Sequence, residues 1–181
     1  VSCPGTDSCK LGITSSMGLG KAIRQNLIEN ASQDTLTKKL HVKISGCPNG
    51  CGQHHLANIG FHGAAVKGPN GQIPAYEVFL GGKYGTVSAE KTKYGQRIPR
   101  IKVPAKRVPE LVSALTKYYS KNRKNDEEFN DFLDRAGVET ISDIVKRYAE
   151  IPPNGAASNL YMDWEKTILY KLERGEGECA V

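Results

Sequence analysis

The sequence has no long apolar run. Its 181 residues are 39% hydrophobic and 24% charged, and no stretch approaches the roughly 20 apolar residues that a membrane-spanning helix needs. No charged-then-apolar leader stands at its start, although a leader on a longer parent chain would lie outside this sequence. We therefore expect a soluble protein with no membrane partner. The length suits one core and is too short for two ordinary domains.

Features of nucleic-acid-binding domains are also missing. Lys and Arg number 25 against 19 Asp and Glu, a formal net charge of +6 that is usual for a solvated surface. No recognition helix or aromatic platform accompanies this charge, so no nucleic-acid partner is predicted. The sequence contains no internal repeat or low-complexity segment.

Cysteine is scarce, and its number is odd. Five cysteines do not suit an extracellular disulfide framework, so a reducing compartment and a cytoplasmic location are expected. Four of them form two pairs, Cys3 with Cys9 and Cys47 with Cys51. Cys179 has no partner nearby in the sequence and is predicted to be a free thiol.

Both cysteine pairs lie in turns rich in small residues. Residues 2–9 read SCPGTDSC, and residues 45–55 read SGCPNGCGQHH directly after the strand-like LHVKI. Glycines here allow close backbone approach, so that amide groups can point at sulfur. The spacings C-x5-C and C-x3-C suit a cubane, because four thiolates must converge while their backbones stay apart. A zinc site, which usually has C-x2-C knuckles, and buried apolar cysteines are the alternatives.

The same residues resemble a known family. CPGTDSC, GCPNGCGQHH and the following ANIGFHG are similar to the C-terminal half of the sirohaem-dependent nitrite and sulfite reductases, closely over roughly the first hundred residues and loosely beyond. The resemblance implies that Cys3, Cys9, Cys47 and Cys51 bind a [4Fe–4S] cluster. It implies that Cys51 is also the axial ligand of the sirohaem iron and so bridges the two centres. Asn49 is expected near the macrocycle, with a plain turn-forming role as the alternative.

The function implied by the resemblance is six-electron reduction of nitrite to ammonia or of sulfite to sulfide. Electrons would come from ferredoxin or another donor. The segments GCGQHH and IGFHG resemble the nitrite-reducing members more closely than the sulfite-reducing ones. We expect this chain to be an excised, cofactor-binding half that is inactive alone and carries no catalytic residues of its own. An N-terminal half of the parent protein would face it across a pseudo-twofold axis. The competing hypothesis is a non-catalytic metal-binding or electron-transfer domain.

The patterning and the resemblance together predict an α/β (α+β) fold, with a mixed, largely antiparallel sheet flanked by helices as one half of the sirohaem reductase architecture. The domain is expected over residues 1–150, with a tail over 151–181 that lies on its surface through Leu160, Tyr161, Trp164 and Tyr170. Apolar periodicity predicts helices over residues 16–31, 109–119, 126–136 and 139–148. Alternation predicts strands over residues 40–44, 57–66, 75–80 and 98–103. The last strand contains Pro99 and is therefore expected at a sheet edge.

The histidines near the second cysteine pair are tempting ligands. Because thiolates already fill the cluster and the axial haem position, His54 and His55 are predicted to be hydrogen-bonded or surface residues instead. His41 and His62 are assigned to strand surfaces.

A basic stretch over residues 83–102 could dock an acidic electron carrier by electrostatic steering, with a merely solvated loop as the alternative. No Arg or Lys lies beside the second cysteine turn in the sequence, and the nearest are Lys43 and Lys67. Lys10 adjoins Cys9.

Overall fold

A computed structural model describes residues 1–30, 34–85, 91–152 and 158–172. Its centre is a four-stranded sheet in the order β1-β2-β3-β4, in which β1 is parallel to β2 and the other pairs are antiparallel. The strands are β1 (Val42–Ser45), β2 (Ile59–Gly68), β3 (Gly71–Leu80) and β4 (Gln96–Pro104). This confirms the predicted mixed, largely antiparallel sheet. Cys179 lies outside the described residues.

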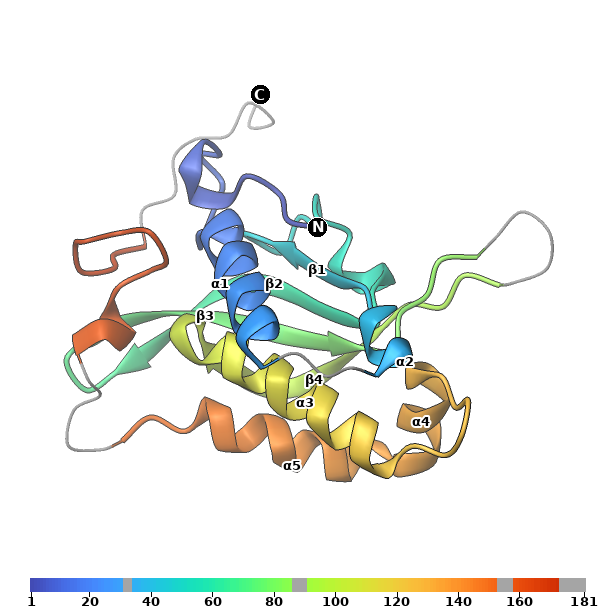
Figure 1. The fold of residues 1–181 in the computed structure, drawn as a ribbon. Coiled ribbons are helices and arrows are strands. Elements are labelled where there is room, and N and C mark those ends of the chain that lie inside the picture. Colours follow the sequence, from blue (N-terminus) through green and yellow to red (C-terminus); the bar gives the residue numbers. More distant parts are fainter. Residues whose placement is uncertain (31–33, 86–90, 153–157, 173–181) are drawn as a thin grey trace.

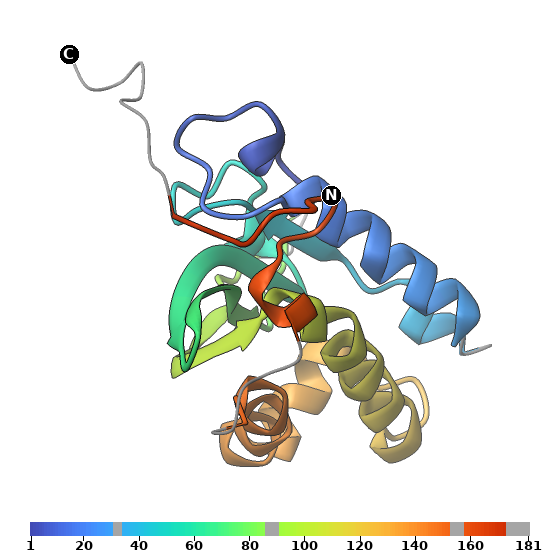
Figure 2. The ribbon, with the colours of Figure 1, turned by 90° about the vertical axis from the view of Figure 1, so that its left-hand side faces the viewer.

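Helices cover one face of this sheet (Figures 1 and 2). The α-helices are α1 (Ser16–Glu29), α2 (Thr35–Lys38), α3 (Val108–Asn122), α4 (Phe129–Ala136) and α5 (Val138–Ala149). Every second side chain of a strand points towards them, so Phe61 and Val78, which pair across β2 and β3, are both fully buried beneath the helices. Leu111 and Leu115 of α3 meet them in the same core. Among the described residues, no helix is long and apolar enough to cross a bilayer.

The connection between β1 and β2 carries the second cysteine turn. Two parallel neighbours cannot be joined by a tight hairpin, because the chain must return to the starting end of the first strand. Residues 46–58 make this return, and the short 3₁₀-helix η2 (His54–Leu56) within them folds back over the sheet. The topology therefore requires a long excursion where the sequence places Cys47 and Cys51.

The second face of the sheet, opposite the helices, holds an imidazole and aromatic cluster. His62 on β2 was expected on a strand surface, but it is only 8% exposed. Its ring lies 5.1 Å from that of His54 and 5.2 Å from that of Phe79, centroid to centroid. The prediction was wrong because η2 covers this face, which a strand pattern by itself cannot reveal.

The strand β4 lies at an edge, as predicted from Pro99. Its pairing with β3 shifts register between Glu77 and Phe79, and Arg100 has a left-handed φ of 61°. Proline has no N–H for the ladder, so the irregularity falls where pairing is already broken.

Residues 158–172 follow the helices and return to the sheet. The 3₁₀-helix η4 (Ser158–Tyr161) buries Leu160 and Tyr161 against Ile73 of β3. From there the chain runs towards the start of α1 (Figure 2). The expected division at residue 150 stays a prediction.

Candidate metal centre

The two cysteine turns meet beside the start of α1. The first turn contains the 3₁₀-helix η1 (Gly5–Asp7), and Ser2 just before it bridges to Ile44 of β1 in parallel. The Cys3 amide donates to the Ile44 carbonyl over 3.1 Å. The Gly46 amide in turn donates to the Cys3 sulfur over 3.1 Å. One thiol of the first pair is thus hydrogen-bonded by the backbone of the second turn.

A short segment, residues 12–16, joins the turns from behind. The amides of Ile13 and Thr14 both donate to the Gly46 carbonyl, over 2.8 and 3.1 Å. The Thr6 amide donates to the Thr14 carbonyl over 3.2 Å, which ties this segment to the first turn as well. The relative position of the two cysteine pairs therefore depends on residues 12–16.

Glycine makes this contact possible. A Cβ on Gly46 would lie 2.6 Å from the Gly5 Cα and 2.8 Å from the Thr14 carbonyl oxygen. Side chains do not tolerate such distances, so the two turns approach at a point where neither has a side chain.

The other three thiols of the two turns lie close enough to Cys47 to influence it. Cys47 is 6% exposed, Cys3 is half-buried, and Cys9 and Cys51 are exposed. Burial raises the pKa of the Cys47 thiol, and the nearby Cys3, Cys51 and Cys9 raise it further, while the Asn49 backbone N–H opposes the rise. Four thiols that repel as anions need a cation among them to be thiolates together.

The donor set fits an iron–sulfur cluster better than a single ion. Within the described part of the chain, no three His, Cys, Asp or Glu side chains are placed to share one metal ion. A zinc ion binds all of its sulfur ligands directly, with bonds of about 2.3 Å, so these sulfurs lie close together. In a cubane each thiolate binds a different iron, so the four sulfurs lie further apart. Backbone amides directed at Cys3 and Cys47 are the hydrogen bonds that such clusters receive.

His54 lies beneath the second turn as a hydrogen-bonded residue. It is 4% exposed, and its Nδ1 lies 2.9 Å from the Ser45 hydroxyl oxygen, which also accepts from the Gly52 amide over 3.0 Å. Burial, with His62 and His55 nearby, lowers the pKa of His54 to about 4. Its ring is therefore neutral near pH 7. The His55 ring stacks on Tyr94 at 5.5 Å.

The Lys43 side chain contacts the second cysteine turn. Its separation from Gln53 along the sequence gave no indication of this contact. Lys43 is 7% exposed, and its Nζ donates to the Gln53 side-chain oxygen over 3.1 Å and to the Tyr84 hydroxyl. The signal was available in the alternation of β1, since Lys43 and Ser45 are two residues apart and share a face. Asn49 is exposed at the outer side of the same turn.

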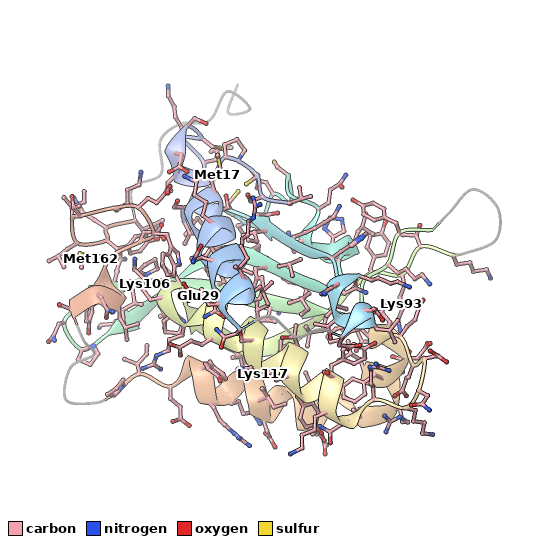
Figure 3. The ribbon with its side chains drawn as sticks, viewed as in Figure 1. Met17, Glu29, Lys93, Lys106, Lys117 and Met162 are labelled. Carbon is pink, nitrogen blue, oxygen red and sulfur yellow. The ribbon has the colours of Figure 1, made fainter. Side chains whose placement is uncertain are left out.

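Three of the six described cations of the basic stretch have acidic partners. Lys83 lies 3.6 Å from Glu128, and Arg97 lies 3.0 Å from Glu77. Lys93 pairs with Asp134 at 2.9 Å, and Figure 3 shows it at the end of the molecule near α4. Residues 86–90 of this stretch lie outside the described part.

Comparison with known proteins places these turns in a family. The family model described as "Nitrite and sulphite reductase 4Fe-4S domain" matches residues 1–153, which include both cysteine pairs. A sulfite reductase [ferredoxin] of Mycolicibacterium paratuberculosis is 26% identical over 78% of this chain and 25% of its own length. An assimilatory ferredoxin-dependent nitrite reductase of Haloferax mediterranei is 24% identical over 79% of this chain and 24% of its own. The structure of NirA from Mycobacterium tuberculosis superimposes with a TM-score of 0.65 at 25% identity, covering 78% of this chain and 26% of NirA.

These matches define a class of oxidoreductase domain that holds an iron–sulfur cluster. The chain belongs to the nitrite and sulphite reductase 4Fe-4S domain family. It spans about a quarter of the length of the curated relatives it matches.

Proposed function

We propose that Cys3, Cys9, Cys47 and Cys51 hold one [4Fe–4S] cluster. The observation that carries this proposal is the convergence of four thiols from two turns, which share hydrogen bonds at Gly46 and Cys3. The Gly46 and Asn49 amides would each donate to a ligand thiolate. Such donors stabilise negative charge on sulfur and help to set the potential at which a cluster accepts an electron.

Cys51 is the ligand we assign to a second centre. Its side chain is exposed, unlike that of Cys47, and Asn49 lies exposed in the same turn, so a sirohaem could be ligated from this side. When bound, cluster and sirohaem together would supply electrons one at a time to nitrite or sulfite. The chain's own task would be to present the Cys51 thiolate to both groups while it buries Cys47.

The proposed reaction class is reduction of nitrite or sulfite as part of an assimilatory-type reductase, in a reducing, cytoplasmic setting. Its support is that a relative named for each activity matches more than three quarters of this chain. An anionic substrate needs several fixed cations around it. Near the second turn this chain offers Lys43, which already donates to neutral Gln53 and Tyr84. We therefore propose that this chain alone does not turn over, and that the other substrate-binding cations come from an N-terminal half.

Anaerobic reconstitution with iron and sulfide tests the cluster. We expect about four iron and four sulfide per chain. Cys47→Ser should lose most of this iron, whereas Cys179→Ser, which changes the one cysteine outside the two turns, should keep it. Two irons per chain, or full loading of Cys47→Ser, would contradict the proposal. A cluster without sirohaem bands after supply of both groups would favour the electron-transfer alternative.

Turnover of the isolated chain is tested with iron, sulfide, sirohaem and a low-potential dye, beside the full-length sulfite reductase of M. paratuberculosis. We expect no measurable reduction of sulfite or nitrite. A rate within about tenfold of the full-length enzyme, a barrier difference of only ~1.4 kcal/mol, would show that no further cations are required.

The electron donor is proposed to be ferredoxin or another acidic carrier, docking on the basic stretch. Lys91 is exposed, and reversing it to Glu should slow ferredoxin-dependent reduction in the complete enzyme, less so as salt rises. Lys117→Glu on α3, where Figure 3 shows it on the helical side, is the matched control. Equal rates for both variants at low ionic strength would remove the docking proposal.

A further inference from the structure

We propose that residues 158–172, here called the strap, hold residues 12–16 against the second cysteine turn, with Asp163 and Tyr170 as the positioning residues. The inference rests on the proposed cluster and concerns how its ligands are kept in place. The strap lies beyond residues 1–153, which the family model matches. It runs alongside the start of α1 and the first cysteine turn (Figure 2).

Asp163 binds the segment at the helix start. It is 3% exposed, and its Oδ2 accepts from the Ser15 amide over 2.7 Å, while its Oδ1 accepts from the Trp164 amide over 2.8 Å. Ser15 is the N-cap of α1, and its own hydroxyl accepts from the Gly18 amide. A carboxylate at this position also suits the partial positive charge of a helix start. A strap residue therefore fixes the point where residues 12–16 enter α1.

Tyr170 binds the same segment two residues earlier. Its hydroxyl donates to the Ile13 carbonyl over 3.0 Å. Burial, together with Asp163, raises the pKa of Tyr170 to about 12, so this hydroxyl keeps its proton and remains a donor. The Ile13 amide donates to the Gly46 carbonyl. Ile13 is thus held by the strap through its carbonyl and by the second cysteine turn through its amide.

The strap is itself anchored to the rigid part of the fold. The Trp164 indole N–H donates to the Ala105 carbonyl over 2.9 Å, and the Lys106 Nζ lies 4.1 Å from the Trp164 ring centroid. Lys106 also donates to the Asp163 carbonyl over 3.1 Å, and Figure 3 shows it beside the strap near Met162. At the first cysteine turn, Lys166 pairs with Asp7 at 3.4 Å. The strap is therefore bound both to the segment that follows β4 and to the first cysteine turn.

The test uses the full chain, with two variants that remove one strap contact each. Tyr170→Phe deletes the hydroxyl that binds Ile13, and Asp163→Asn replaces one acceptor oxygen by a donor facing an N–H. Tyr161→Phe is the matched control, because it also removes one strap hydroxyl, but one that accepts from Asn70 at the β2–β3 turn. In the metal-free chain, hydrogen exchange at residues 13–16 should quicken about threefold to tenfold in the first two variants, the range expected from one lost hydrogen bond. The control should leave these residues unchanged.

The second readout is loss of the reconstituted cluster to an iron chelator. We expect Tyr170→Phe and Asp163→Asn to lose it about threefold to tenfold faster than the wild type, with Tyr161→Phe at the wild-type rate. Wild-type exchange at residues 13–16 in both variants, or an unchanged rate of cluster loss, would overturn the strap. A wild-type chain that takes up no cluster refutes the proposed function instead, and the exchange measurement then still decides whether the strap holds this segment.

Discussion

His54 is a buried base whose surroundings keep it uncharged. It lies between Ser45, His62 and Phe79 and is almost inaccessible to solvent. A histidine in the unfolded chain has a pKa near 6.5, whereas the folded pKa is about 4. Below pH 6.5 the unfolded chain gains a proton that the folded chain does not accept. The contribution of His54 to the free energy of unfolding is therefore fully present above pH 6.5 and is lost as the pH drops towards 4.

Replacing His54 should flatten this dependence. Urea unfolding of the metal-free chain should show a loss of at most about 3 kcal/mol between pH 6.5 and pH 4 that belongs to this residue. In His54→Asn, whose amide can still reach Ser45, stability at pH 7 should be lower because ring packing is lost, but the decline towards pH 4 should be shallower. The exposed His41→Asn is the control and should retain the wild-type slope. An identical slope in His54→Asn would contradict the assignment.

Residue chemistry in the site was predictable where it depended on neighbours along the chain. The cysteine spacing and the glycines between them lie within short windows, and the structure brings both windows together at Gly46. His62 was misplaced, and the contacts of Lys43 were not predicted, because the residues around both come from distant parts of the sequence. Lys43 meets Tyr84, 41 residues away, and His62 is covered by a 3₁₀-helix whose path no periodicity records.

At the scale of elements, α1 shows how closely the strap approaches a helix. Two of its glycines, Gly18 and Gly20, differ in what a methyl group would meet. On Gly18 it would lie 2.7 Å from the Trp164 Cβ, and on Gly20 its nearest neighbour would be the Ser2 hydroxyl oxygen at 3.2 Å. The first neighbour is held in place by its own backbone, whereas the second is a small rotatable group.

The two substitutions should therefore differ in their effect on the free energy of unfolding. Gly18→Ala should destabilise the chain by about 1–3 kcal/mol through overpacking. Gly20→Ala should range from neutral to about 1 kcal/mol stabilising, because alanine is the better helix former. Denaturant unfolding of both variants measures the contrast, and equal effects would mean that Trp164 moves aside without cost.

The longer elements were predicted well, and the differences lie at their ends. The helices α3, α4 and α5 follow their apolar periodicity, and the β2–β3 hairpin is present. Its strands extend further than predicted, to the pair Gly68 and Gly71, since backbone pairing continues past the last apolar side chain. Helix α2 was not predicted, because its four residues are too few to show a period.

For the whole molecule, a bound cluster would join two turns that lie about forty residues apart in the sequence. A cluster bound to both turns closes a long loop of the chain. Any ligand that binds only the folded state also stabilises the folded state. We expect reconstitution to raise the melting temperature by about 5–15 °C, since ~1 kcal/mol shifts it by about 2–4 °C in a chain of this size. Anaerobic calorimetry before and after loading measures the shift.

Protection should also be local. Hydrogen exchange should slow most at residues 3–16 and 45–52, whereas α5, on the far side of the core, should change little. Cys47→Ser, treated in the same way, is the control and should show neither effect. An equal slowing throughout the chain without a rise in melting temperature would argue against binding at the two turns.

The irregular edge of the sheet has a consequence for how the chain behaves at high concentration. An uninterrupted outer strand offers a row of free amides and carbonyls on which another chain can add a strand, and this is a common route to fibrils and precipitates. β4 breaks that row, because Pro99 has no amide hydrogen and Arg100 turns the backbone at the register shift. A Pro99→Val variant should restore part of the row and precipitate at lower concentration. We therefore expect the irregular backbone of β4 to hinder strand addition by a second copy of the chain.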